Sequence, residues 1–296
     1  ADQFYNKALV MLTGISPGST SVQRNIAQTH INQGINYAAM QQHSCAVQCY
    51  TEAVAIHREI SQNAASFDIA ETLTMQGNSY TAMEQYEDAE KCFKEGSDML
   101  REIAQDDASK AKDVAKALSN QGNNHNNMGR YRDAEQCYTE SLAVYREISE
   151  GDTSVDVAQI LYNQGNNYSA MKQYSSAEQS YTEALALYRD ISQGTASMYI
   201  AVTLLQQCIY YNEIKQYCKA ALCNAEALAI FKKISNGADS TDIAETLHAR
   251  GDYYRATGRE RRGAKEYQKA MKIFMALKPG HPLVTKILLK LTDMQT

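Results

Sequence analysis

Residues 162–168 read Tyr-Asn-Gln-Gly-Asn-Asn-Tyr, and residues 119–125 read Ser-Asn-Gln-Gly-Asn-Asn-His. The glycine of this stretch belongs to a series that runs through the chain at steps of 43, 45, 43, 43 and 43 residues. The positions of the series are Gly34, Gly77, Gly122, Gly165, Cys208 and Gly251. A fixed period in this range is typical of stacked supersecondary units. We therefore expect a tandem repeat whose function lies on a surface built from many copies.

The residues around each glycine follow a helical pattern. An aromatic residue or His stands three positions after the glycine position, and Leu or His stands four positions before it, which places them on one helix face. A small residue follows twelve positions after, and an aromatic residue four positions later in five copies: Tyr50, Phe93, Tyr138, Tyr181 and Tyr267. These columns predict a second amphipathic helix, with Gly and Ala where the two helices cross closely. Copy five has Cys208 and Asn224 in these columns, so we interpret it as a structural spacer.

Two of the first helices carry a possible start signal. Asp68 with Glu71, and Asp242 with Glu245, have the spacing of a capping box, in which each side chain satisfies a free backbone donor of the first turn. We expect the helices to begin within a few residues of these aspartates.

The whole pattern resembles the tetratricopeptide repeat, whose signature places Leu, Gly and Tyr on a first helix and Ala, an aromatic residue and Ala on a second. The ordinary unit has about 34 residues, whereas most copies here have 43. The longer unit and the segment 242–247 are similar to the long repeats of kinesin light chains, and the Asn-Gln-Gly-Asn core is similar to spindle-orientation adaptors of the same fold. The resemblance implies an all-α fold, a right-handed superhelical solenoid of antiparallel helix hairpins.

The resemblance extends over nearly the whole chain, which we treat as a single solenoid at 1–296. The predicted parts are a half repeat at 1–20, repeats at 21–63, 64–108, 109–151, 152–194, 195–237 and 238–280, and a C-terminal capping helix at 281–296. Because residues 1–9 align with residues 177–185 inside a second helix, we interpret the chain as a piece of a longer array.

The residue before the glycine position is Gln in five of six copies, where the family usually has a buried Leu. A buried amide without a partner costs on the order of 1 to 3 kcal/mol. We therefore expect the Gln side chains to bond along the superhelix or to neighbouring backbone.

Composition limits the kind of protein. No stretch is apolar and long enough to span a bilayer, so we expect no membrane partner. The seven cysteines contain no Cys-x-x-Cys pair, and four recur at one offset of successive second helices: Cys49, Cys92, Cys137 and Cys223. That placement predicts packing, with no metal site and no cofactor. So many free thiols indicate a reducing compartment, and we expect a cytoplasmic protein.

The first helices of such a superhelix line its concave side, and their groove-facing columns lie two before, one after and four after the glycine. Asn dominates the central copies, and a carboxamide offers a donor and an acceptor to an extended backbone. The resemblance implies that such Asn residues hold a peptide. The predicted groove residues are Asn32, Asn78, Asn120, Asn123, Asn126, Asn163, Asn166, Gln206 and Asn212, with Lys116, Tyr162, His248 and Arg255 as side-chain anchors.

These features predict a protein–protein interaction scaffold or adaptor that binds an extended peptide segment of a partner in its groove. No arrangement of nucleophile, base and orienting group recurs, and no Gly-rich phosphate loop is present, so we do not expect an enzyme. One alternative is a structural or self-associating spacer or sensor array of a larger protein. The other is an anionic partner or nucleic acid at the basic end, where residues 255–290 carry ten Lys or Arg and two acids. We favour the protein partner over nucleic acid, and further repeats or domains of the same longer chain are also candidate partners.

Overall fold

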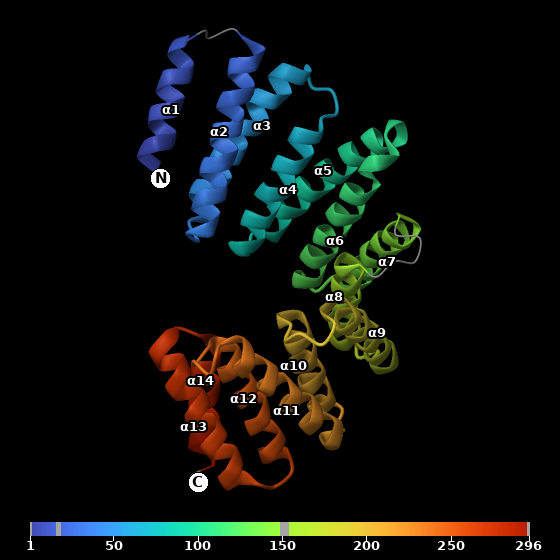
Figure 1. Ribbon diagram of the computed structural model, residues 1–296, viewed down its shortest axis with the longest axis vertical. Coiled ribbons are helices and arrows are strands. Elements are labelled where there is room, and N and C mark those ends of the chain that lie inside the picture. Colours follow the sequence, from blue (N-terminus) through green and yellow to red (C-terminus); the bar gives the residue numbers. More distant parts are fainter. Residues whose placement is uncertain (1, 16–18, 149–153, 295–296) are drawn as a thin grey trace. The chain divides into compact units, whose positions relative to one another are not determined.

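The computed structural model describes residues 2–15, 19–148 and 154–294. Within these residues the chain forms fourteen α-helices, one 3-10 turn and no strand (Figure 1). The chain divides into two compact units, Ala1–Gly151 and Asp152–Thr296. The predicted all-α class is confirmed.

Unit 1 contains the first seven helices, which follow one another as antiparallel hairpins. They are α1 (Asp2–Ile15), α2 (Thr20–Ala39), α3 (His43–Ser61), α4 (Phe67–Ala82), α5 (Tyr86–Asp106), α6 (Ala111–Asn127) and α7 (Tyr131–Ile148), with the 3-10 turn at Ala108–Lys110. Unit 2 contains α8 (Val155–Ala170), α9 (Tyr174–Ser192), α10 (Met198–Glu213), α11 (Tyr217–Ile234), α12 (Thr241–Ala256), α13 (Glu260–Leu277) and α14 (Pro282–Asp293).

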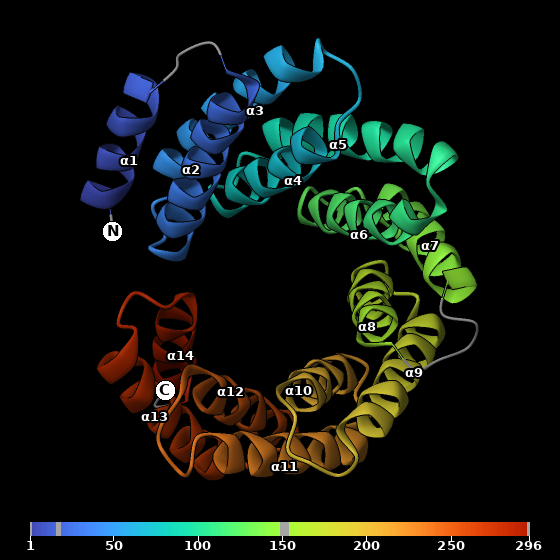
Figure 2. The same ribbon diagram turned by 45° about the horizontal axis from the view of Figure 1, so that its top comes forward.

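Each unit has two layers of helices. The first helices of the hairpins contact one another, as α2 with α4, α4 with α6, α8 with α10 and α10 with α12. The second helices form the other layer, which Figure 2 shows for α9, α11 and α13 of unit 2. We call the solvent-facing side of α2, α4 and α6 in unit 1, and of α8, α10 and α12 in unit 2, the first-helix face. This face is where the predicted groove residues belong.

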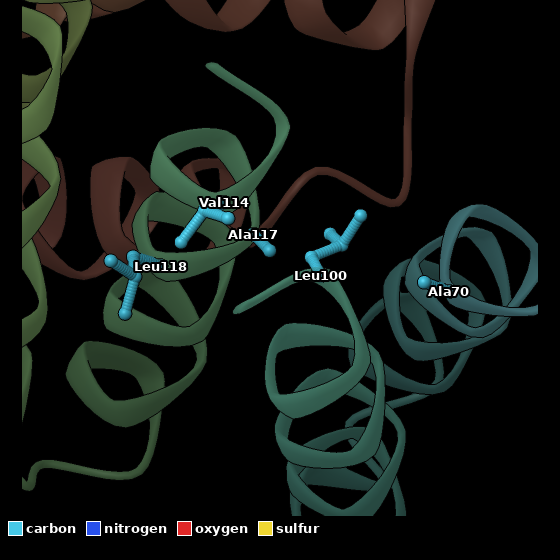
Figure 3. Close-up of a cluster of buried hydrophobic side chains, with 5 residues drawn as sticks. All are labelled: Ala70, Leu100, Val114, Ala117 and Leu118. Atoms are coloured by element: carbon cyan, nitrogen blue, oxygen red, sulfur yellow. The ribbon is translucent and has the colours of Figure 1, made fainter. Parts of the chain in front are cut away.

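We number the hairpins from α2–α3, the first, to α12–α13, the sixth. A hydrophobic cluster holds the second hairpin (α4–α5) and the third hairpin (α6–α7) of unit 1 together. Leu100 of α5 packs with Ala70 of α4 and with Val114, Ala117 and Leu118 of α6 (Figure 3). The second helix of one hairpin thus buries apolar surface against the first helix of the next. Each hairpin needs its neighbour to complete its core.

The helix starts differ from the predicted capping boxes. Ser66 and Ser240 are the N-cap residues of α4 and α12, and the Ser240 hydroxyl accepts a hydrogen bond from the Ile243 backbone N–H at 3.2 Å. Asp68 and Asp242 lie inside the first turn, so the predicted capping boxes are wrong, although each helix begins only one residue before its aspartate. A serine in extended conformation, two residues earlier, already caps α12. The aspartates then interact favourably with the positive end of the helix.

The glycine column lies directly against an aromatic ring of the second helix. A Cβ atom added to any of these glycines would stand only 2.5 to 2.8 Å from the nearest ring carbon, closer than carbon atoms can approach. The pairs are Gly34 with Tyr50, Gly77 with Phe93, Gly122 with Tyr138, Gly165 with Tyr181, and Gly251 with Tyr267. The missing side chain therefore leaves the space that the ring fills.

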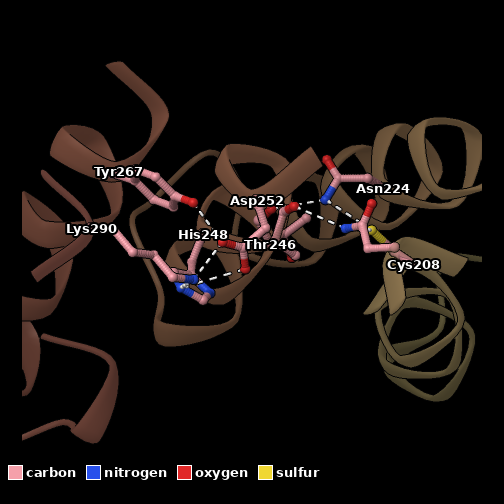
Figure 4. A network of polar contacts seen from close by, with 9 residues as sticks. Cys208, Asn224, Thr246, His248, Asp252, Tyr267 and Lys290 are labelled. Atoms are coloured by element: carbon pink, nitrogen blue, oxygen red, sulfur yellow. Dashed lines mark hydrogen bonds and ion pairs between the residues drawn. The ribbon is translucent and has the colours of Figure 1, made fainter. Parts of the chain in front are cut away.

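The fifth hairpin replaces both partners of this contact. Cys208 stands for the glycine and Asn224 for the ring, and the Asn224 amide donates to the Cys208 sulfur at 3.7 Å. The same amide nitrogen donates to the Thr246 carbonyl of α12 at 2.8 Å (Figure 4). A smaller, polar side chain makes room for the thiol, and its hydrogen bond connects α11 to the next hairpin.

The Gln column finds partners on the second helices. Gln76 donates from Nε2 to the Thr51 hydroxyl of α3 at 2.8 Å, and its Oε1 accepts from the Cys92 thiol of α5 at 3.7 Å. Burial raises the pKa of Cys92 to about 11, so this thiol keeps the proton that it donates. Gln33 likewise reaches Asn6 of α1 at 3.4 Å. Gln33 and Gln76 thus bond to side chains of the preceding second helix, as predicted. Gln164 instead donates to the Tyr168 hydroxyl of its own helix at 3.4 Å, and Gln207 accepts from the Cys223 thiol of α11 at 3.7 Å.

The helix α14 docks on α12 through polar contacts. Lys290 makes an ion pair with Asp252, and its Nζ lies 3.0 Å from His248 Nε2 and 5.4 Å from the centroid of the Tyr267 ring (Figure 4). Arg255 and Asp293 approach to 3.6 Å. Burial lowers the pKa of His248 to about 4, with Asp252 opposing and Lys290 adding to the shift. At neutral pH the imidazole is therefore uncharged and can accept from the Lys290 ammonium.

The glycine contact predicts that Gly165→Ala lowers the free energy of unfolding by about 1 to 3 kcal/mol, because the new methyl group overpacks a fixed ring. Tyr181 is 1 % exposed and is held by Asn166, so it cannot yield easily. Urea unfolding measures the loss. The control is Gly280→Ala, whose Cβ would meet nothing within 4 Å and which should change stability by less than about 0.5 kcal/mol. Equal losses in both variants would contradict the packing account.

The buried imidazole predicts a pH dependence. A histidine has a pKa of about 6.5 in an unfolded chain and here about 4 in the folded one. Between these values the unfolded chain binds a proton that the folded chain does not, so stability falls as the pH decreases from about 6.5 to about 4. The wild type should lose up to about 3 kcal/mol more than His248→Gln over this range. Urea titrations of both proteins at several pH values test this, and parallel curves would rule it out.

Candidate functional site

The thirteen predicted groove and anchor residues, His248 of α12 among them, all lie on first helices. Lys116, Asn120, Asn123 and Asn126 belong to α6, and Tyr162, Asn163 and Asn166 to α8. The others are distributed as Asn32 on α2, Asn78 on α4, Gln206 and Asn212 on α10, and Arg255 on α12. Each of them is at least partly exposed. The hydrogen bonds of these side chains decide which of them still have groups to offer a ligand.

The column one position after the glycine is bound by the aromatic residue that packs on that glycine. The Tyr138 hydroxyl donates to Asn123 Oδ1 at 2.7 Å, and the Tyr181 hydroxyl donates to Asn166 Oδ1 at 2.7 Å. The same contact in the sixth hairpin joins Tyr267 to Asp252 at 2.5 Å. The ring therefore holds the polar side chain in one orientation.

Asn166 has a second internal partner. Tyr162, one turn earlier on α8, is bound by side-chain hydrogen bonds from both Asn166 and Gln206, and these bonds oppose the rise in its pKa that burial causes. The Asn166 side chain thus contacts two tyrosines, Tyr181 through its oxygen and Tyr162 one turn earlier. These three predicted ligand contacts are tied to one another in the structure, where they connect α8 to α10.

Two further asparagines use only their oxygen. The Tyr188 hydroxyl donates to Gln159 Oε1 at 3.2 Å, and Gln159 Nε2 donates to Asn163 Oδ1 at 3.2 Å. These two hydrogen bonds engage the Asn163 oxygen, and the Asn163 nitrogen makes no hydrogen bond among the described residues. Gln28 Nε2 donates to Asn32 Oδ1 at 3.2 Å in the same way. Both asparagines therefore offer N–H donors at the surface.

Unit 1 holds the amides with the fewest internal bonds. Among the residues that the structure describes, no hydrogen bond is made by the side chains of Asn78 and Asn120, or by the nitrogen of Asn123. Asn78 stands opposite Phe93, which has no hydroxyl to donate. Because buried or half-buried amides normally find partners, unbonded N–H groups on α4 and α6 are suited to contact a ligand.

Two predicted residues of unit 2 have structural partners instead. The Asn212 nitrogen donates to the Ala249 carbonyl of α12 at 3.2 Å. Arg255 faces Asp293 of α14 at 3.6 Å, and the neighbouring anchor candidate His248 is covered by Lys290. The helix α14 therefore occupies the end of the first-helix face of unit 2.

A small depression of about 40 Å³, open to solvent, lies between the starts of α4 and α6. Its lining residues are Phe67, Glu71, Thr74, Leu100, Asp113, Lys116 and Ala117. The Lys110 ammonium lies 4.1 Å from the centroid of the Phe67 ring. Glu71, Asp113 and Lys116 form no ion pair within 4 Å in the described part of the chain. An apolar floor with unpaired charges at its rim is suited to hold a side chain of a ligand.

The sequence reasoning missed this depression and the role of the second Asn after the glycine. Asn124 is fully buried, donates to the Tyr86 carbonyl at 3.0 Å and contacts the Thr81 hydroxyl at 3.3 Å. Consecutive helix residues point about 100° apart, so Asn123 and Asn124 could not both face the ligand. That rotation was the signal available in the sequence.

A metal centre and a membrane span receive no support from the described residues, whereas the basic end of the chain does present an exposed basic surface. No group of three or more His, Cys, Asp or Glu side chains is placed to hold a metal ion. Over the same residues, every helix is too short or too polar to cross a bilayer. The exposed side of α13 carries Arg261, Arg262, Lys265, Lys269 and Lys272, while the acid Glu266 is buried and paired with Arg250 and Lys269.

Known structures share this arrangement of helices. BtubC (BKLC) from P. vanneervenii is 19% identical, with a TM-score of 0.66 over 80% of this chain and 92% of that one. The putative kinesin light chain repeats of Podosopora anserina are 12% identical, with a TM-score of 0.59 over 72% of this chain and 98% of theirs. A Rap protein complexed with Competence and Sporulation Factor is 12% identical, with a TM-score of 0.59 over 96% of this chain and 78% of that one. At these identities the likeness concerns the fold alone.

The sequence itself matches a family model. No curated protein matches the sequence of the chain. The model described as Tetratricopeptide repeat matches residues 25–102 and 113–190, which together make up more than half of the chain and contain four of the six glycine-column positions. The columns of small and aromatic residues, the hairpins and this match agree: the chain belongs to the tetratricopeptide repeat family.

Proposed function

We propose that this protein is an interaction module whose first-helix face in unit 1 binds an extended segment of a partner protein. The observation that carries the proposal is the set of unbonded amide N–H groups at Asn78, Asn120 and Asn123. Carboxamides on successive first helices can hold the backbone of a segment regardless of its side chains. The proposal assigns no catalysis to the chain.

Hydrogen bonds alone give limited affinity. Three neutral bonds at about 0.5 to 1.5 kcal/mol each contribute about 1.5 to 4.5 kcal/mol, before the cost of ordering the segment. The depression at Phe67, Leu100 and Ala117 lies on the same pair of helices. An apolar side chain of the partner placed there would add the burial that the amides lack.

Two other observations support the proposal. The Rap protein of similar fold is complexed with Competence and Sporulation Factor, so this fold holds a partner in at least that protein. All seven cysteines of the present chain are free thiols, which fits a reducing compartment such as the cytoplasm. The free thiols thus support the proposal that the partner is an intracellular protein.

The binding role predicts that Asn120→Ala combined with Asn123→Ala weakens binding of peptides selected on the wild type by about tenfold or more, because at least two hydrogen bonds are lost. The peptides come from a random twelve-residue display library, and fluorescence anisotropy gives their Kd. The matched control is Gln48→Ala with Gln105→Ala, which removes two exposed amides from the second helices α3 and α5. Unchanged affinity in the first variant would refute the amide face.

Asn166 should behave differently from Asn120, although both were predicted from the same pattern. Asn166→Ala removes the partner of the buried Tyr181 hydroxyl and a partner of Tyr162, so it should lower the free energy of unfolding by about 1 to 3 kcal/mol. Asn120→Ala should lower it by less than about 0.5 kcal/mol. Urea unfolding of the two variants tests the distinction, and equal stabilities would show that the internal bonds of Asn166 contribute nothing.

A further inference from the structure

The outer face of α13 departs from the pattern of the other second helices. Three columns of these helices, which lie ten, fourteen and twenty-one positions after the glycine position, are exposed in all six hairpins. In the first hairpin the columns hold Ser44, Gln48 and Ala55, and the fourth hairpin repeats Ser, Gln and Ala. In the sixth hairpin they hold Arg261, Lys265 and Lys272.

The exposure of these columns does not depend on being at the end of the stack. The helices α9 and α11 lie beside α13 in the outer layer of unit 2 (Figure 2), and their side chains in the same columns are exposed although hairpins lie on both sides of α11. Uncharged side chains satisfy these positions in α9 and α11. The fold therefore does not require the positive charge of α13.

The basic residues of α13 lie on one side of the helix. Consecutive helix residues are rotated by about 100°, which places five of them within a sector of about 100°. We call these five the α13 basic stripe: Arg261, Arg262, Lys265, Lys269 and Lys272. From Arg261 to Lys272 the stripe extends about 16 Å along the helix axis. The exposed acid of this helix, Glu260, points about 100° away from Arg261 and so lies outside the stripe.

Four of the five cations have no counter-charge within the chain. Among the residues that the structure describes, Arg261, Arg262, Lys265 and Lys272 make no ion pair. Lys269 pairs with Glu266 at 3.1 Å, and the side chain of this glutamate is only 11 % exposed and also pairs with Arg250. The stripe therefore presents its charge to solvent.

The stripe begins in a hollow of the surface. This hollow, open to solvent and about 670 Å³ in volume, lies at the turn between α12 and α13. Its lining residues are Gly258, Arg259, Glu260, Arg261 and Arg262. A phosphate group in the hollow would meet the unpaired guanidinium groups of Arg261 and Arg262, and a guanidinium group can bind phosphate oxygens through two parallel hydrogen bonds.

The composition of the stripe favours a nucleic acid over other anionic partners. Every fully exposed side chain between residues 260 and 272 is polar. A protein partner normally needs apolar surface at the centre of the interface, and a helix on a lipid surface inserts apolar side chains. The phosphate backbone of a nucleic acid needs neither, because its affinity comes from the release of counterions by Lys and Arg.

The same face favours a double strand over a single strand. Proteins that hold single strands stack the bases on exposed aromatic side chains, whereas Tyr267, the aromatic residue between 260 and 272, is fully buried. Each strand of a duplex carries one phosphate per about 3.4 Å of helix axis. A stripe of about 16 Å thus matches about five phosphates of one strand.

We propose that the α13 basic stripe is a second binding surface of this protein and that it binds the phosphate backbone of a double-stranded nucleic acid. The surface lies on a second helix of unit 2, so it is separate from the first-helix face of unit 1. Contacts to phosphate carry no information about base sequence, and the stripe therefore binds duplexes of any sequence. This inference does not depend on the proposed function.

The test titrates the full chain into a labelled DNA duplex of about twenty base pairs and measures the Kd by fluorescence anisotropy at several salt concentrations. Three to four phosphate contacts give a slope of about −3 for the logarithm of the association constant against the logarithm of salt concentration. Affinity should therefore fall about sixtyfold for a fourfold rise in NaCl. A slope weaker than about −1 would overturn the proposal.

The decisive variant combines Arg261→Gln, Lys265→Gln and Lys272→Gln, which removes three cations of the stripe. It should weaken duplex binding at low salt at least tenfold and reduce the slope to about −1 or less. All three side chains are exposed and unpaired, so the fold should be kept, and thermal unfolding followed by circular dichroism checks this. Unchanged duplex binding would remove the stripe as the site.

The matched control combines Lys91→Gln, Lys94→Gln and Arg132→Gln, which removes three exposed cations from α5 and α7. Lys91 and Arg132 stand in the columns of Lys265 and Arg261, so the net charge and the helix face change in the same way. The control should bind the duplex within about twofold of the wild type. Equal losses in the two triple variants would mean that binding follows net charge alone, and the proposal would fail.

Three further probes at the same salt concentration separate the kinds of anionic partner: the single strand, oligoglutamate, and vesicles that contain phosphatidylserine. The duplex should bind at least about tenfold more tightly than the single strand or oligoglutamate, because its charge density is the highest of the three. Tighter binding of oligoglutamate would assign the stripe to an acidic protein, and binding to vesicles without binding to the duplex would assign it to a lipid surface. Either result overturns the proposal.

Discussion

The contact between a first-helix glycine and the face of a second-helix ring sets the geometry of five hairpins. Because the glycine has no side chain, the ring carbon comes within 2.5 to 2.8 Å of where a Cβ would stand. The two helices can then cross closely, and the ring is buried almost completely, as at Tyr138 and Tyr181. Everything else in a hairpin is placed relative to this crossing. The fifth hairpin keeps the crossing by changing both partners, with Cys208 and Asn224 in hydrogen-bond contact.

The polar chemistry of the first-helix face follows from the same contact. A tyrosine ring that packs on the glycine places its hydroxyl beside the next residue of the first helix, so that Asn123, Asn166 and Asp252 are all bound at an oxygen. A ligand can therefore bind only the polar atoms of these side chains that the tyrosine does not engage. The Asn166 side chain also forms a hydrogen bond with Tyr162, whereas Tyr138 is the only such partner of Asn123 among the described residues.

The two layers of helices have different structural roles. Second helices supply the buried rings, the thiols and the hydroxyl groups that satisfy the Gln column, as Thr51 and Cys92 do for Gln76. A buried amide is costly when unpaired, and here its two ends are bound by two successive second helices. Gln33 and Gln76 therefore tie their helices to the second helix before them, where a leucine would only pack.

The sequence alone determined the period, the all-α class and the family, because these depend on columns of residue types that repeat every 43 to 45 positions. It also identified the first-helix columns that face solvent, since helical spacing assigns a residue to one side of a helix. It failed at the capping boxes, where Ser66 and Ser240 precede the aspartates and cap the helices.

Tertiary structure decided which of the matching amides are available to a ligand. Asn120 is equivalent to Asn163 in the sequence, and Asn123 to Asn166, yet their hydrogen bonds differ because the side chains around them vary. Tyr162, itself bound by Gln206 of α10, contacts Asn166, and Gln159, which accepts from Tyr188 of α9, donates to Asn163. The depression at Phe67 and Leu100 likewise needs three helices to exist. The repeat period predicts which residues occupy equivalent positions. Hydrogen bonding and packing depend on which side chains meet in space, and that is decided only when the hairpins stack.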